Sequence, residues 1–453
     1  MCDVSHEPYA GEMPSAHGSP PPVRRGRCRG LFVALGALTM PPIMIGGCPA
    51  AGTGDRAGAA PVFNNTNDPL NGGAGYIGSA ACSACHADVA DRARLHAHRF
   101  ALTPVVGRRP AFPEEGTRAG VPEPPGTSEW ADVSYLIGGY THAALFVDAQ
   151  GYILTDGLAG VSTQWTLAFP PTDTTAAFVP FQPDRVNALP LQYECFRCHT
   201  TGPAAATAGA PSSQDGRPGI GGTWAEAAVG CEACHGPGSR HLPNPGARDL
   251  FVDATPATCG GCHTAGADPD VIPVIGGYIH PYAQYNELRA SGGHADFNCT
   301  VCHDPHASTV YDRVNGIRNT CSTCHSDANM AAHAGVVFVR GTYREPVTCE
   351  SCHMPFAALS AAAAAQTVVG TTGRMGDVRS HIFRIATRAA DYRDLFSTDG
   401  SRVLKDAHGR AAVTVDFVCL RCHTDDSAMP NSAFYLSPES AWQIATGLHR
   451  LPQ

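Results

Sequence analysis

The sequence is poor in charge, and its basic residues are outnumbered by acidic ones. Asp, Glu, Lys and Arg make up 16% of the 453 residues, and the formal net charge is −9. A basic nucleic-acid motif is absent and the net charge repels polyanions, so nucleic acid is excluded as a partner. The 49 Gly and 37 Pro argue against long amphipathic helices and predict a loop-rich fold.

Long apolar runs are also lacking, because no run after residue 47 is long enough to span a bilayer. The apolar run 31–47 follows a basic stretch at 24–29 and ends Ile45-Gly46-Gly47-Cys48. This ending resembles a bacterial lipoprotein box, with 1–47 as the signal peptide and Cys48 as the lipidated residue. The alternatives are ordinary signal cleavage and retention as a single membrane anchor. All three export the chain, to the periplasm or the outer surface.

Spare cysteines are lacking too. Of 19 Cys, 16 belong to eight copies of Cys-x-x-Cys-His, and every Cys after Cys48 is part of this pattern. None is left over to crosslink the fold, which argues against a disulfide scaffold. Zinc ribbons and thioredoxin-like pairs also use Cys-x-x-Cys, but zinc chemistry does not require a His after each of eight pairs.

The repeated pattern is the attachment signature of c-type haem. Two thiols three residues apart each form a thioether to one haem edge, which places the next residue's imidazole against the iron. We therefore predict eight covalently attached haem c groups. The predicted attachment residues are Cys82, Cys85, Cys195, Cys198, Cys231, Cys234, Cys259, Cys262, Cys299, Cys302, Cys321, Cys324, Cys349, Cys352, Cys419 and Cys422. The predicted proximal iron ligands are His86, His199, His235, His263, His303, His325, His353 and His423.

Methionine is too scarce to supply many distal ligands, since four Met remain after residue 47. Histidine is not scarce, because eleven remain once the motif and leader histidines are set aside. The supply permits bis-histidine ligation throughout, which lowers the haem potentials and leaves no iron open to substrate. The predicted distal ligands are His96 in preference to His98, with His142, His241, His280, His294, His306, His333 and His381; His408 and His449 are spares.

The motif spacing predicts four regions. After the leader, 48–75 has the small polar composition of a flexible tether; 76–425 forms an octahaem cytochrome domain, and 426–453 is a C-terminal extension. The gap after the first motif predicts a β insertion at about 130–190, with a short antiparallel sheet over Val133–Leu154 and a turn near Gln150-Gly151. A strand is also expected over 411–418. We predict a mostly irregular and α-helical multihaem cytochrome fold, organised around stacked haems, with a small inserted β module.

Several stretches resemble a known family. They are Val229–His241, Tyr193–Pro203, Cys302-His303-Asp304-Pro305-His306, and Cys352-His353-Met354-Pro355 followed by Arg379–Phe383. They look like multihaem c-type cytochromes of the group that includes nitrifier tetrahaem carriers and octahaem hydroxylamine oxidoreductases. The resemblance implies stacked haems, mostly bis-His, with distal ligands at His241, His306 and His381. Catalytic members leave one iron open or use Cys-x-x-Cys-Lys, and all eight motifs here end in His.

Two functions follow from these features. The first is an exported octahaem electron carrier that serves redox protein partners or an external electron acceptor. The alternative is an oxidoreductase acting on a small nitrogen or sulfur compound at one open iron, where Tyr140 with His142, or Tyr278 with His280, would donate protons. Self-assembly into a cytochrome filament, with a distal His crossing between subunits, is a third hypothesis.

Overall fold

The computed structural model describes residues 73–172, 175–207, 213–246, 250, 255–328, 330–360, 367–425 and 434–448. Contacts divide the chain into Met1–Gly58 and Ala59–Gln453, and every described residue belongs to the second unit. The predicted signal peptide, Cys48 and the tether up to residue 72 lie outside the described residues. No helix in the described ranges is long and apolar enough to cross a membrane.

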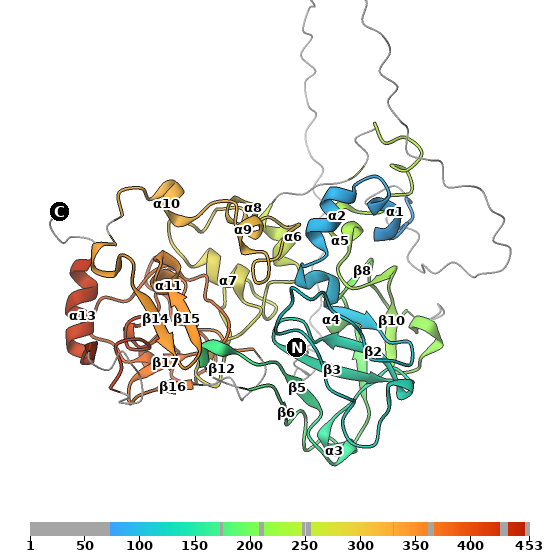
Figure 1. Ribbon diagram of the computed structural model, residues 1–453, viewed down its shortest axis with the longest axis horizontal. Helices are drawn as coiled ribbons and strands as arrows, with labels where there is room; N and C mark the ends of the chain where they lie inside the picture. The colour runs from blue at the N-terminus through green and yellow to red at the C-terminus, as the bar shows by residue number, and fades with distance from the viewer. Residues whose placement is uncertain are drawn as a thin grey trace, which may run out of the picture. The chain divides into compact units, whose positions relative to one another are not determined.

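The largest element is a nine-stranded sheet in the first half of the second unit (Figure 1). Its central path runs β1-β2-β3-β4-β7-β10-β9, and β5 and β6 branch from β3. All pairs are antiparallel except β7 with β10. The strands are β1 (Leu102–Pro104), β2 (Val133–Gly138), β3 (Ala143–Asp148), β4 (Tyr152–Ile153), β5 (Gln164–Thr166), β6 (Ala177–Val179), β7 (Leu189–Gln192), β9 (Ala204–Ala205) and β10 (Ile220–Thr223).

The predicted antiparallel sheet over 133–154 is confirmed. Strand β2 pairs with β3 and β3 pairs with β4, with the turn at Asp148–Gly151. The β2–β3 hairpin turns at Gly138, whose φ is 78° and where an added Cβ would lie 2.4 Å from the Ala143 carbonyl oxygen. Five consecutive residues of β2 and of β3 are buried, so both faces of this part of the sheet are covered.

The β content is larger than predicted, so the expectation of a mostly irregular and α-helical fold is wrong in that respect. Strands of the sheet run from Leu102 to Thr223, beyond the expected 130–190, and enclose the motif at Cys195. The fold is mixed α/β. Four two-stranded sheets add β8 (Thr200–Thr201) with β11 (Glu226–Ala227), β12 (Val274–Ile275) with β13 (Tyr278–Ile279), β14 (Val337–Arg340) with β15 (Tyr343–Pro346), and β16 (Thr367–Val369) with β17 (Gly373–Met375).

The described helices are short, as the Gly and Pro content predicts, and the longest has 10 residues. The strand expected over 411–418 is wrong, because Val415–Val418 is helical and Thr414 is its N-cap. The α-helices are α1 (Ser79–Ser83), α2 (Ala87–Ala93), α3 (Asp156–Ala159), α4 (Tyr193–Phe196), α5 (Cys231–His235), α6 (Pro256–Gly260), α7 (Gln284–Arg289), α8 (Cys299–Cys302), α9 (Arg313–Gly316), α10 (Cys321–Cys324), α11 (Cys349–His353), α12 (Val415–Val418) and α13 (Pro438–Gly447). Single 3-10 turns are η2 (Ala97–Phe100), η3 (Trp130–Asp132), η4 (Pro170–Thr172), η5 (Gln214–Gly216), η6 (Ala331–His333) and η8 (Tyr392–Leu395).

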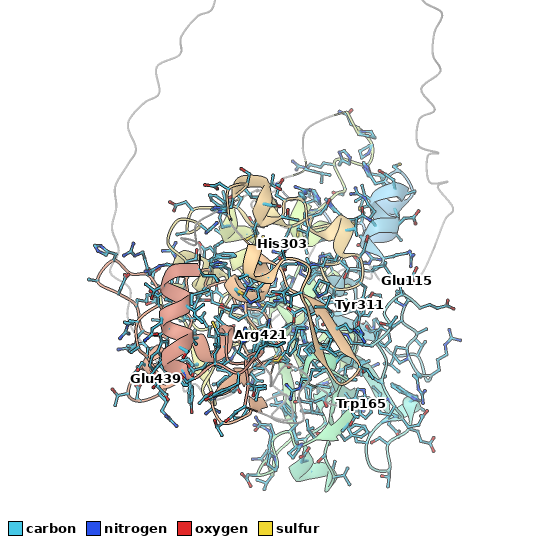
Figure 2. All side chains as sticks on the ribbon, turned by 60° about the vertical axis from the view of Figure 1, so that its left-hand side comes forward. Glu115, Trp165, His303, Tyr311, Arg421 and Glu439 are labelled. Carbon is cyan, nitrogen blue, oxygen red and sulfur yellow. The ribbon has the colours of Figure 1, made fainter. Side chains whose placement is uncertain are left out.

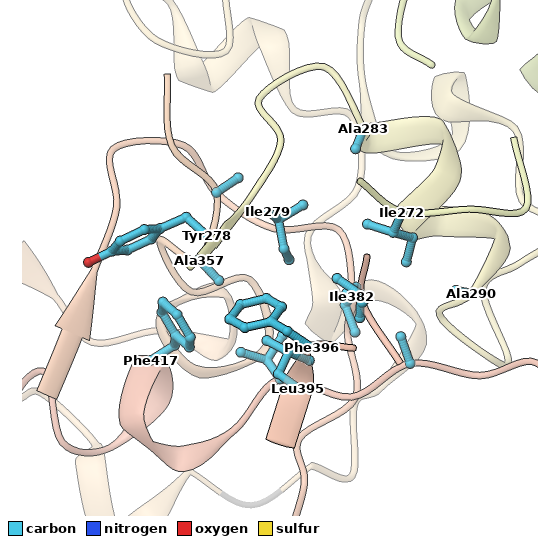
Figure 3. Packing of buried hydrophobic residues seen from close by; sticks show 14 of the residues in the cluster. Ile272, Tyr278, Ile279, Ala283, Ala290, Ala357, Ile382, Leu395, Phe396 and Phe417 are labelled. Atoms are coloured by element: carbon cyan, nitrogen blue, oxygen red, sulfur yellow. The ribbon is translucent and has the colours of Figure 1, made fainter. Parts of the chain in front are cut away.

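The largest apolar core cluster lies in the second half of the unit (Figure 3). Phe396 and Phe417 pack with Ile279 and Ile382, and the rings of Tyr278 and Phe417 form a T-shaped contact with 5.7 Å between ring centres. These side chains come from segments far apart in the sequence. The core therefore fixes the strand that precedes His280, the loop that carries His381 and the helix that precedes Cys419 against one another.

Candidate haem-binding centres

Each of the eight Cys-x-x-Cys-His motifs lies on a short helix or directly after one. Four helices start at the first Cys and include both cysteines: α5, α8, α10 and α11. Helix α1 holds Cys82 and ends before Cys85. The motifs at Cys195 and Cys259 start inside α4 and α6, and Cys419 follows α12. One turn of helix brings residues three apart to the same face, which is the arrangement that two thioethers to one haem edge require.

Four motif histidines are oriented through one ring nitrogen. The Nδ1 atoms of His199, His353 and His423 donate to backbone carbonyl oxygens of Ala101, Phe383 and Phe434 at 2.8, 2.8 and 2.7 Å. His263 Nδ1 lies 3.2 Å from Oε1 of Gln284. Fixing Nδ1 in this way selects the tautomer whose Nε2 is free to bind a metal. These four imidazoles are therefore oriented with Nε2 available as a ligand.

Five motif histidines each face a second imidazole at nearly constant spacing. The ring centres are 6.1 Å apart in four pairs and 5.9 Å apart in the fifth. An iron about 2.0 Å from each ligating nitrogen, with each ring centre about 1.1 Å further out, would hold two ring centres about 6.2 Å apart. The residues therefore fit bis-histidine haem iron. The pairs are His263 with His98, His235 with His306, His325 with His294, His303 with His381, and His423 with His333.

The ring geometry favours His98 over His96, against the preference drawn from the sequence. His98 is the ring that lies 6.1 Å from His263. His96 is the N-cap of η2, and its Nδ1 accepts the backbone N–H of His98 at 3.2 Å. Burial lowers the pKa of both imidazoles, that of His96 to about 4. The N-cap role was hidden in the sequence because it depends on where the 3-10 turn begins.

Two further predicted ligands lie on segments that adjoin a motif. The loop before His241 packs beside the first motif helix, where Ser239 N–H donates to Gly75 O at 3.1 Å and Gly75 N–H donates to Ser239 Oγ at 2.8 Å. The strand before His280 bonds the chain directly after α11, with Ile279 N–H donating to Ala357 O at 3.0 Å. These contacts bring His241 toward the Cys82 motif and His280 toward the Cys349 motif.

The other predicted histidines are not placed opposite a motif imidazole in the described part of the chain. His142 Nδ1 is 4.0 Å from Oδ2 of the buried Asp377, and among the described residues no motif imidazole stands at ligand spacing from it. The hydroxyl of Tyr140 donates to the Leu95 carbonyl at 3.0 Å, and a role of Tyr140 with His142 as proton donors stays a hypothesis. His408 is exposed, and His449 lies outside the described residues.

Thiols from different motifs come together. Cys82 pairs with Cys231, Cys198 with Cys262, and Cys259 with Cys299. Cys85 and Cys195 are disulfide-bonded, and attachment of haem at these two sulfurs stays a prediction. A disulfide at these sulfurs and thioethers at both motifs exclude each other, because each sulfur makes one or the other bond. The pairs nonetheless show that motifs distant in the sequence are neighbours.

A carboxylate beside two ligands was missed at the sequence level. Oδ1 of Asp304 accepts the backbone N–H of His306 at 2.9 Å and lies 3.3 Å from His306 Nδ1. Arg92 and Arg318 flank its other oxygen at 3.3 and 3.6 Å. A carboxylate at Nδ1 orients a ligating imidazole and increases its basicity. The signal present in the sequence was an acid two residues before a predicted ligand.

A second buried carboxylate supports the His381 segment. Glu287 accepts the His381 backbone N–H at 2.7 Å and the Ser380 hydroxyl at 2.5 Å. Burial raises the pKa of Glu287 to about 7. The contact joins α7 to the loop of a predicted distal ligand, and nothing in the sequence pattern connects positions so far apart.

Comparison with known proteins agrees with these features. Residues 182–236, which contain two of the motifs, match the family of cytochrome c554 and c-prime. The chain is similar in structure to the octaheme sulfite reductase MccA of Wolinella succinogenes, form II, with a TM-score of 0.54 and 16% identity over 85% of this chain and 72% of that one. The chain is a multihaem c-type cytochrome. Haem c is thus its covalently bound cofactor, and this class of cytochrome acts in electron transfer.

Other solved structures resemble this cytochrome more weakly. The outer cell wall cytochrome OcwA gives a TM-score of 0.45 at 17% identity, covering 82% of this chain and 86% of that one. The undecaheme cytochrome from the S-layer of Carboxydothermus ferrireducens gives 0.39 at 16% identity, covering 83% and 60%. No protein with a curated description matches the chain.

Proposed function

We propose that this cytochrome is an exported octahaem electron carrier with mostly bis-histidine haems. The observation that carries the proposal is the recurrence of two imidazoles 5.9 to 6.1 Å apart at five motifs. An iron with two axial imidazoles has no position left for a substrate, so it exchanges electrons only. His241 and His280 are the candidates for two of the remaining irons, at the Cys82 and Cys349 motifs.

The attachment sulfurs of successive motifs are neighbours, and we expect the haems to form one conducting path. The thiols of Cys234 and Cys259, Cys302 and Cys324, Cys321 and Cys349, and Cys352 and Cys419 interact electrostatically. Together with the paired thiols Cys82–Cys231 and Cys259–Cys299, these contacts link seven motifs in series. Cys198 beside Cys262 joins the eighth. A continuous series supports electron transfer across the whole unit.

Export and the domain limits belong to the same proposal. The leader 1–47, the anchor at Cys48, the tether 48–75, the octahaem domain 76–425 and the extension 426–453 rest on sequence. Attachment of c-type haem in an exported chain agrees with a periplasmic or outer-surface location. Its partners would be redox proteins or an external electron acceptor, with self-assembly into a filament as a further hypothesis.

One observation favours a second candidate function, catalysis at the haem of the Cys195 motif. Among the described residues, neither His199 nor His86 has a second imidazole at ligand spacing. His86 is exposed and near the His241 loop, whereas His199 is half-buried and its Nδ1 donates to the Ala101 carbonyl oxygen. An open iron at His199 would bind a small nitrogen or sulfur compound, and the structural neighbour MccA is named as a sulfite reductase.

Protein-film voltammetry of the purified cytochrome separates the two functions. A carrier gives overlapping one-electron waves that are unchanged by sulfite, nitrite or hydroxylamine. A catalytic current with one of these compounds would support the reaction at His199 and overturn the carrier. The variant His199→Met tests the assignment, because it should abolish such a current if that iron is the site.

A further inference from the structure

A buried cluster of two arginines and one glutamate lies between the last two haem motifs. Arg421 is 1% exposed, and its Nη1 and Nη2 lie 3.2 and 3.3 Å from the carboxylate oxygens of Glu345, which is itself buried. Arg379 Nη2 reaches the same carboxylate at 2.9 Å. Figure 2 labels Arg421 near the middle of the view. The face of Phe356 receives both guanidinium groups, at 4.3 Å from Arg379 and 5.8 Å from Arg421.

The cluster binds the helix that carries one proximal ligand. Arg421 donates to Ser351 O at 3.0 Å, and Arg379 donates to Glu350 O and Met354 O at 3.1 and 2.9 Å. The hydroxyl of Ser351 donates to Glu345 Oε1 at 2.9 Å. These are backbone and side-chain groups of α11 and the residue after it, so two cations meet the carbonyls of a helix that ends at His353.

The same cluster reaches a second motif and a distal-ligand segment. Arg421 stands between Cys419 and Cys422 in its own motif, and its charge interacts with the thiols of Cys422 and Cys352. Arg379 is two residues before His381. The cluster therefore adjoins the attachment sulfurs of two motifs at once, which no other cation–carboxylate pair named above does.

The cluster carries a net positive charge. Two arginines and one carboxylate sum to +1. Burial acts to raise the pKa of Glu345, but the charges of Arg421 and Arg379 lower it to about 2, so the carboxylate is ionised at neutral pH. Inside a protein the effective dielectric constant is far below that of water, so one buried charge acts strongly on its neighbours. A haem loses one unit of positive charge on reduction, and nearby positive charge disfavours the oxidised form.

We propose that Glu345, Arg379 and Arg421 set the reduction potentials of the haems at Cys349–His353 and Cys419–His423 and hold these two sites in register. The inference rests on the proposed attachment of haem at both motifs. It makes the three residues positioning residues for electron transfer, because they act through the motifs and do not ligate iron.

Two substitutions that change the charge of the cluster in opposite directions test the proposal, because they should shift the reduction potentials in opposite directions. Glu345→Gln changes the cluster charge from +1 to +2 and should move two of the eight potentials upward. Arg421→Met changes it to 0 and should move the same two downward. The double variant restores +1 and should bring both potentials back toward those of the unaltered protein. Arg393→Met is the control, since Arg393 forms an exposed pair with Asp391 and its side chain is 71% exposed.

The measurement is a potentiometric titration of the full-length holoprotein, with haem content determined by intact mass. Shifts of the same sign in Glu345→Gln and Arg421→Met, or no shift with eight haems bound, would overturn the inference. A cluster that only holds the fold together predicts a lower free energy of unfolding in the variants, with all eight potentials unchanged. Should Arg421→Met fail to accumulate, Arg379→Met removes the same charge from a side chain that is 25% exposed and must also lower the two potentials. Fewer than eight haems in the unaltered protein would instead count against the proposed function.

Discussion

The imidazole rings of His235 and His306 lie 6.1 Å apart and within 10° of parallel. One ring belongs to a haem motif and the other comes from the loop after a different motif, and three helices separate the two residues in the sequence. The distance between the ring centres matches that of two imidazoles on one iron. The same spacing at four other motifs makes it a general feature of this cytochrome.

Replacing a distal ligand changes one haem. His381→Met should raise the potential of the haem at Cys299–His303 and shift its optical spectrum, because a thioether stabilises ferrous iron better than imidazole does. Optical potentiometry reads both effects. His408→Met is the matched control on an exposed loop. A spectrum and potentials unchanged in His381→Met would remove His381 from the ligand set.

The choice between His96 and His98 is testable by spin state. His98→Ala should convert one haem in eight from low-spin to high-spin, since His98 is the ring 6.1 Å from His263. His96→Ala removes an N-cap contact of η2 and should cost about 1 kcal/mol of unfolding free energy with every haem still low-spin. Electron paramagnetic resonance of the two variants shows which histidine is the ligand. A high-spin haem in His96→Ala and none in His98→Ala would restore the preference for His96 made from the sequence.

Asp304 should lower the potential of the haem at Cys231–His235 through His306. Asp304→Asn removes the negative charge 3.3 Å from His306 Nδ1 and leaves Arg92 and Arg318 without their partner. Both effects destabilise ferric iron, so this one potential should rise. Asp312→Asn, at a carboxylate that accepts from the Asn315 amide, should leave all potentials in place. A fall in potential would contradict the role given to the carboxylate.

The lowered pKa of Glu345 should make the free energy of unfolding depend on pH. Its pKa is about 2 in the folded protein against an ordinary value of 4.5. The ionised Glu345 carboxylate therefore contributes about 3 kcal/mol to the free energy of unfolding. This contribution is complete above about pH 4.5 and is lost as the pH falls toward 2. The difference in unfolding free energy between the unaltered protein and Glu345→Gln, followed by circular dichroism in urea, should shrink over that interval. A difference independent of pH would show that the ion pairs contribute little.

The haem count is tested at Cys85 and Cys195. The proposed function expects eight haems and a mass that does not change on reduction with dithiothreitol. A gain of two hydrogens on reduction would show that these two sulfurs form a disulfide in the mature protein, and that two motifs each lack a thioether. Peptide mapping of the two segments locates the difference.

The sequence predicted the motifs and the β2–β3–β4 hairpins because both depend on short-range patterns. It identified four histidines that the structure places opposite motif imidazoles, namely His294, His306, His333 and His381, because iron needs a sixth ligand and Met was scarce. The sequence could not show which distal histidine lies opposite which motif histidine. His333 is eight residues from His325 but faces His423, and that choice depends on tertiary packing.

Other features had no local signal. The sheet extends beyond the expected insertion because β1, β9 and β10 are short strands that pair with distant partners. Glu345 and Arg421 are 76 positions apart, and a lone Glu or a motif Arg is usually solvated. Their roles appear only once the chain is folded around the two motifs.

The most direct test of the account is a low-temperature electron paramagnetic resonance spectrum of the oxidised, purified protein, quantified against its haem content. Electron transfer through bis-histidine haems predicts that every iron is low-spin and that the spectrum is unchanged by nitrite, hydroxylamine or sulfite. One high-spin iron in eight that responds to one of these compounds would contradict it and would place the chemistry at an open haem, with His199 as the first ligand to examine.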